Sequence, residues 1–79
     1  MPARVLFDQT TALGKVGRRI RTLVEFSGVP RGTTGQVIQA DPSGVGYTLA
    51  IQWELPERRA RPLVDWFSKT EYERFLVEI

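Results

Sequence analysis

The chain has 79 residues, of which 42% are apolar and 25% charged, with eleven lysine and arginine residues against nine aspartate and glutamate residues. These values are typical of one small globular domain and exclude disordered, collagen-like and coiled-coil chains. The chain contains no cysteine and no histidine. Disulfides, thiolate or imidazole zinc sites, and Cys–His or Ser–His–Asp catalysis are therefore excluded. Because no apolar run is long enough for a membrane span and no signal peptide opens the chain, we expect a cytoplasmic protein.

The charges are unevenly distributed along the chain. Nine of the eleven basic residues are arginine, whose planar guanidinium group favours carboxylates and phosphates. Residues 15–31 carry five basic residues against one acidic residue, whereas residues 62–79 carry four acidic residues against two basic ones. Such a dipolar surface favours an acidic partner at its basic end. Pairing of these charges within the molecule is the alternative.

Residues 1–14 show no sustained hydrophobic period. The short apolar patch at Leu6 and Phe7 is followed by four polar residues. We therefore expect residues 1–14 to form an N-terminal extension, docked through Leu6 and Phe7 and mobile at its very start. Residues 15–79 are expected to form a single small domain.

Regular structure is predicted to begin after Gly17. Alternation over residues 18–26 predicts a strand with one solvent face; its inward residues are Ile20, Thr22, Val24 and Phe26. Pro30 and Gly32 suit the second and fourth positions of a type I turn.

A hairpin is predicted to follow this turn. Residues 36–40 form its first, short strand, and the Asp-Pro-Ser-Gly sequence of residues 41–44 is typical of a turn. The clearest strand covers residues 47–55, where five large apolar residues alternate with smaller or polar ones. Trp53 lies in phase with Leu49 and Ile51, so we expect it in the core rather than on a nucleic-acid-binding surface.

Pro56 ends this strand, and the arginine-rich loop of residues 56–62 has no apolar anchor, so we expect it to be exposed. A fourth strand is predicted over residues 63–67. We expect Val64 and Trp66 to face inward, because the opposite phase would bury Asp65.

Residues 68–71 form a capping box, in which Ser68 and Glu71 each satisfy the backbone N–H of the other. A helix is therefore predicted to start at Lys69. The residues after Tyr72 fit both helix and strand spacing, and we favour one or two helical turns followed by a short closing strand over residues 75–79.

These elements predict an all-β (mainly β) fold: a small, closed or half-open antiparallel barrel of four or five strands, with one short helical segment near the C-terminus. Residues 17–20 and 30–37 resemble a KOW-type segment of a Src-homology-3-type barrel. The shared pattern is a glycine before a basic first strand, then a basic-Gly-x-x-Gly-x-Val turn that starts at Arg31. This chain departs from the pattern by a longer insert at residues 23–29. It also resembles small uncharacterised bacterial and phage proteins that combine this turn with a tryptophan-bearing strand.

The resemblance implies binding of RNA or of other proteins, without catalysis. We expect a non-enzymatic module that binds a protein, as a small subunit or regulator of a larger bacterial assembly. The alternative is an RNA- or DNA-binding barrel that uses guanidinium groups on phosphates. The candidate partner-binding residues are Arg18, Arg19, Arg21, Arg31, Arg58, Arg59 and Arg61.

Enzymatic and metal-binding functions have little support in the sequence. The candidate acid–base groups show no recognisable spacing; they are Asp41, Glu54, Asp65 and Glu71. Residues 32–35 lack the Gly-Lys-Ser/Thr ending of a phosphate-binding loop, and no carboxylates cluster as a metal site requires. We expect no catalytic site, no cofactor and no metal, and the oligomeric state is left open.

Overall fold

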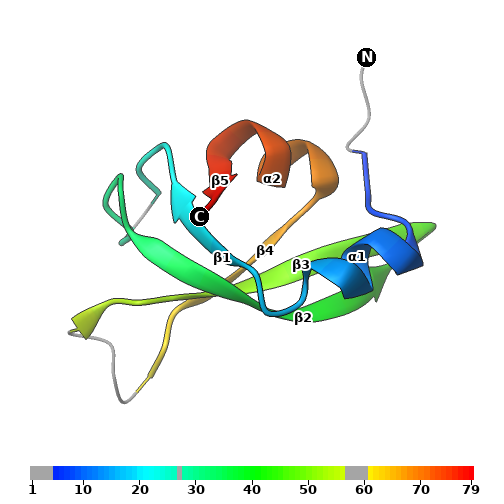
Figure 1. The fold of residues 1–79 in the computed structure, drawn as a ribbon, viewed down its shortest axis with the longest axis horizontal. Helices are drawn as coiled ribbons and strands as arrows, with labels where there is room; N and C mark the ends of the chain where they lie inside the picture. The colour runs from blue at the N-terminus through cyan, green and yellow to red at the C-terminus, as the bar shows by residue number, and fades with distance from the viewer. Residues whose placement is uncertain (1–4, 27, 57–60) are drawn as a thin grey trace.

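The computed structural model describes residues 5–26, 28–56 and 61–79, which form five antiparallel strands and two short helices (Figure 1). In chain order these are α1 (Gln9–Lys15), β1 (Arg19–Thr22), β2 (Thr34–Ser43), β3 (Gly46–Trp53), β4 (Val64–Phe67), α2 (Lys69–Phe75) and β5 (Leu76–Glu78). The predicted mainly β fold class is confirmed. The predicted helix start, its capping box and the short closing strand are also confirmed.

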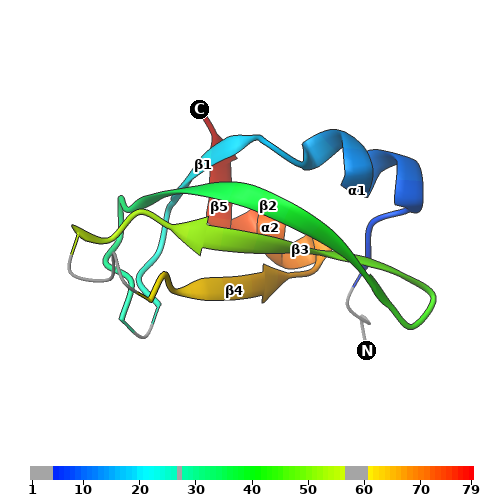
Figure 2. The ribbon, with the colours of Figure 1, turned by 90° about the horizontal axis from the view of Figure 1, so that it is seen from below.

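The strands form one sheet in the order β4-β3-β2-β1-β5, with every neighbouring pair antiparallel. The sheet does not close, because β4 and β5 are its two edges rather than neighbours. Helix α2 connects these two edge strands and contacts both. Figure 2 shows β1 to β4 one above the other, with α2 and β5 behind β2 and β3. The structure is therefore an open, bent sheet with α2 between its edges, not a closed barrel.

Alternate residues of β3 build the centre of the core. Leu49, Ile51 and Trp53 are buried, and Trp53 is only 2% exposed, so its predicted place in the core is confirmed. Each such side chain stabilises the fold by about 1.5–3 kcal/mol. The other buried apolar side chains are Phe7, Ala12, Ile20, Val29, Val37, Ala50, Phe67, Tyr72 and Leu76.

The hairpin between β2 and β3 turns later than predicted. Strand β2 continues through Pro42, which pairs with Tyr47, and the turn consists of Gly44 and Val45. Gly44 has a φ of 64°, as the first central residue of a II′ hairpin turn requires. Pro42 has no N–H to donate, and its partner Tyr47 does not need one from it. The N–H of Tyr47 donates to the carbonyl of Phe7 at 2.8 Å, and the carbonyl of Tyr47 accepts from the N–H of Phe7 at 3.0 Å, so Pro42 is tolerated in the strand.

Strand β1 is shorter than predicted and ends at Thr22. The Thr22 hydroxyl donates to the carbonyl of Val24 at 2.6 Å and accepts from its N–H at 3.2 Å. Such local side-chain bonding competes with a strand ladder. The next turn runs from Pro30 to Thr33, with Gly32 in its third position at a φ of 91°. It is shifted by one residue from the prediction, and the positive φ is that of a type II turn rather than type I.

The segment expected to be an N-terminal extension contributes to the core from Phe7 onward. Phe7 is 1% exposed and forms a bridge with Tyr47. Asp8 then caps α1 by accepting from the N–H of Thr11 at 2.7 Å, and Ala12 is fully buried. The expected docking through Phe7 is therefore seen in the structure, and the helix that follows it adds Ala12 to the core, whereas residues 1–4 lie outside the described part of the chain.

Candidate pocket at the free edge of β4

Two of the predicted arginines form ion pairs within the molecule. Arg19 lies 2.7 Å from the carboxylate of Glu54, which also accepts from the hydroxyl of Thr34. Arg18 lies 3.9 Å from Glu78. Part of the basic charge is thus neutralised by carboxylates of the same molecule, as in the alternative of intramolecular pairing given above.

Three other predicted arginines are exposed. Arg21, Arg31 and Arg61 form no ion pair with any residue that the structure describes. They lie at the end of the sheet where β1 and β3 end and β2 and β4 begin. Arg58 and Arg59 lie outside the described residues, as does most of the loop predicted to be exposed. The structure thus groups a smaller basic set than the sequence suggested.

A polar cluster links the first helix to the last strand. Lys15 donates to the carboxylate of Glu78 at 2.5 Å, and the Tyr72 hydroxyl donates to the same oxygen at 2.9 Å. The Lys15 hydrogen bond holds the pKa of Glu78 below its ordinary value, and burial raises the pKa of Tyr72. The cluster joins α1, α2 and β5, so its role is structural.

Strand β4 has the opposite phase from the one predicted. Trp66 is 57% exposed, and its indole N–H donates to Asp41 at 2.7 Å. Asp65 faces inward, where it accepts from the indole N–H of the buried Trp53 at 2.8 Å. The inward carboxylate is tolerated because it satisfies a buried donor that would otherwise lack a partner.

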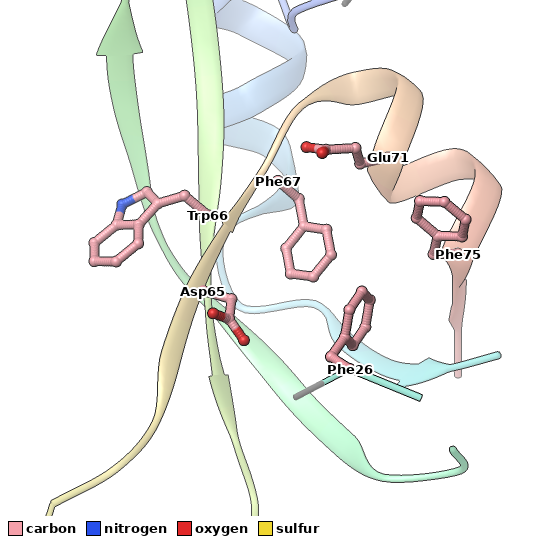
Figure 3. A pocket seen from close by; sticks show the side chains of 6 residues that line it. All are labelled: Phe26, Asp65, Trp66, Phe67, Glu71 and Phe75. Atoms are coloured by element: carbon pink, nitrogen blue, oxygen red, sulfur yellow. The ribbon is translucent and has the colours of Figure 1, made fainter. Parts of the chain in front are cut away.

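A pocket of about 330 Å³ lies between β4, α2 and the residues after β1. Figure 3 shows the rings of Phe26, Phe67 and Phe75 around one space, with Glu71 and Asp65 at its margin. Trp66 is the sixth lining residue, but its indole points to the other side of β4 (Figure 3).

The side chains of the pocket walls pack against one another and against the core. The ring of Phe26 packs edge to face against Phe67 at 5.4 Å and against Phe75 at 6.3 Å between centroids, and it lies 6.0 Å from Trp53. Glu71 is fixed by the capping box, in which its carboxylate accepts from the N–H of Ser68 at 2.9 Å. A ligand in this pocket would meet preorganised aromatic and acidic groups.

The pocket lies beside a strand edge that carries no partner among the described strands. The N–H of Trp53 donates to the carbonyl of Leu63 at 3.0 Å, so every second residue from Leu63 onward pairs its backbone groups with β3, and Asp65 is one of these. The backbone N–H and C=O groups of the residues between, Val64 and Trp66, therefore point away from β3 toward the free edge. The other edge strand, β5, has three residues, and the N–H of Leu76 already donates to the carbonyl of Tyr72.

The sequence did not indicate that the pocket residues lie together, although Asp65 and Glu71 were among the candidate acid–base groups. The aromatic residues fit core positions, and Asp65 and Glu71 are far from Phe26 in the chain. A sequence signal for the pocket itself is that Asp65 interrupts an otherwise apolar strand. Within residues 5–26, 28–56 and 61–79, no acidic residues cluster as a metal site, and no helix is long and apolar enough to span a membrane.

Comparison with known proteins adds no functional assignment. The chain matches no protein-family model, no curated protein and no solved structure.

Proposed function

We propose that this protein is a non-enzymatic binding module for a polypeptide, serving as a small subunit or regulator of a larger assembly. The observation that carries the proposal is the pocket of aromatic and acidic groups beside the free edge of β4. An unpaired strand edge presents alternating N–H and C=O groups, which pair with an extended polypeptide. A nucleic acid has no backbone that matches this pattern, and the carboxylates of Asp65 and Glu71 would repel its phosphates.

Nucleic-acid binding is the second candidate, and a different observation favours it. Arg21, Arg31 and Arg61 are exposed at one end of the sheet without an ion pair in the described structure. The resemblance to a KOW-type segment of a Src-homology-3-type barrel fits this candidate as well. Three phosphate contacts by these side chains would weaken binding about 40-fold between 50 and 200 mM salt.

Capture from the native lysate, with and without nuclease, separates the two candidates. The proposal predicts that the immobilised chain retains a protein after nuclease treatment and at raised salt. If every captured component disappears with nuclease, or binding follows the steep salt dependence of phosphate contacts, the polypeptide-binding proposal is refuted in favour of the second candidate. Retention of no protein under any of these conditions also contradicts the proposal.

A further inference from the structure

We infer that the pocket beside β4 receives a lysine or arginine side chain from an extended segment of the partner. This inference rests on the proposed polypeptide binding and adds the chemistry of the ligand. The pocket combines three phenylalanine rings with the carboxylate of Asp65, and aromatic rings beside a carboxylate favour an organic cation. An aromatic face attracts a cation through its quadrupole, most strongly where water is excluded.

The carboxylate of Asp65 has acceptor capacity beyond its structural role. One oxygen, Oδ2, accepts from the indole of Trp53 at 2.8 Å. An ionised carboxylate has about four acceptor positions on its two oxygens, so Oδ1 can accept from an ammonium or guanidinium group. An apolar ligand side chain would instead desolvate this charge without compensation.

The register of β4 directs a partner side chain to this carboxylate. A segment that pairs antiparallel with the free edge would form its hydrogen bonds with Val64 and Trp66, because these residues direct their backbone groups outward. The partner residue opposite Asp65 would then lie on the pocket side of the new strand. Cross-strand neighbours on one face have Cβ atoms about 4.5–5.5 Å apart. A basic residue at that position therefore reaches the Asp65 carboxylate and the phenylalanine rings together.

The test uses the 79-residue chain and three blocked five-residue peptides made of threonine and valine around a central residue. The central residue is lysine in the first peptide and the uncharged norleucine in the second. The third peptide has the central lysine and N-methyl groups on the two residues beside it, which removes the backbone donors that would pair with Val64 and Trp66. Binding is followed by the NMR shifts of the backbone amides of residues 63–75.

We expect the lysine peptide to bind about tenfold more tightly than the norleucine peptide, and N-methylation to abolish binding. Asp65→Asn keeps an acceptor for Trp53 and removes the charge, so it should weaken the lysine peptide about fivefold and leave the norleucine peptide unchanged. Phe75→Leu should also reduce the preference for lysine. Glu73→Gln is the matched control, because it removes one charge on the exposed face of α2 and should change nothing.

Equal binding of the lysine and norleucine peptides overturns the cation subsite. Equal binding of the N-methylated peptide overturns the strand pairing, and shifts confined to residues outside the pocket overturn both. A protein that is captured from the lysate equally by the parent chain and by Asp65→Asn also refutes the inference while leaving polypeptide binding in place. If the lysate yields no protein, the proposed function itself fails.

Discussion

The hydrogen bond from Trp53 to Asp65 should contribute strongly to stability, and Asp65→Ala tests it. The substitution leaves the indole N–H of a side chain that is 2% exposed without its acceptor. An unsatisfied buried donor costs about 1–3 kcal/mol. A domain of this length has a total stability of about 4–12 kcal/mol, so a loss near 2 kcal/mol is a large fraction of it. The corresponding decrease in Tm is about 8–16 °C.

Urea unfolding followed by tryptophan fluorescence measures this loss. Asp65→Asn is the control, because its carbonyl oxygen still accepts from the indole and the variant should stay within about 1 kcal/mol of the parent. In a double-mutant cycle, Asp65→Ala should cost less in a chain that already carries Trp53→Phe, since the donor is then absent. An unchanged urea midpoint for Asp65→Ala, or equal losses for the alanine and asparagine variants, would refute the reasoning.

Three further predictions follow from the packing and the charges. The hydrogen bond from Lys15 is the main cause of the lowered pKa of Glu78 in the folded chain. The ionised carboxylate therefore stabilises the fold at a pH above its ordinary pKa of 4.5, and this stabilisation is lost as the pH falls through the lower pKa of the folded state. The stability difference between the parent and Glu78→Gln, measured by urea unfolding, should therefore shrink from pH 6 to pH 2.5; a constant difference contradicts this. Phe7→Ala should cost about 3–5 kcal/mol by thermal or urea unfolding, whereas a loss below about 1 kcal/mol would show that the N-terminal segment is dispensable. The triple substitution of Arg19, Arg21 and Arg31 to glutamine should lower stability by less than about 1 kcal/mol, because only Arg19 forms an ion pair with a described residue and an exposed ion pair contributes about 0–1 kcal/mol. A larger loss would show that the arginines are structural counter-ions, and partner capture shows whether they bind.

The elements that the sequence predicts well are those encoded by neighbouring residues. The start of α2 depends on Ser68 and Glu71, three residues apart, which satisfy each other's backbone groups. The inward face of β3 follows from strict alternation up to Trp53, which is independent of the rest of the fold. These predictions are correct because the determining contacts are local or the periodicity is long.

The errors occur where a distant partner decides the local structure. Pro42 signals a turn, yet it lies in β2 because its neighbour Tyr47 bonds to Phe7 instead. Helix α1 has seven residues and includes two threonines and a glycine, which are poor helix formers. It is supported by its Asp8 cap and by burial of Ala12 against the sheet. A segment this short shows no sustained period, so the sequence did not indicate that it forms a helix.

The candidate site was missed for a related reason, which Asp65 makes clear. The sequence argues for burying Trp66, because an inward Asp65 costs free energy unless a buried donor compensates it. That donor is the indole of Trp53, and no sequence pattern shows that the two side chains meet. The hydrogen bond between them holds the carboxylate of Asp65 at the margin of an aromatic pocket, where its second oxygen can bind a ligand. Asp65, which contradicts the predicted strand phase, is thus the centre of the proposed site. Its structural role and its binding role are separated by Asp65→Asn, because this substitution keeps the acceptor for Trp53 and removes the charge.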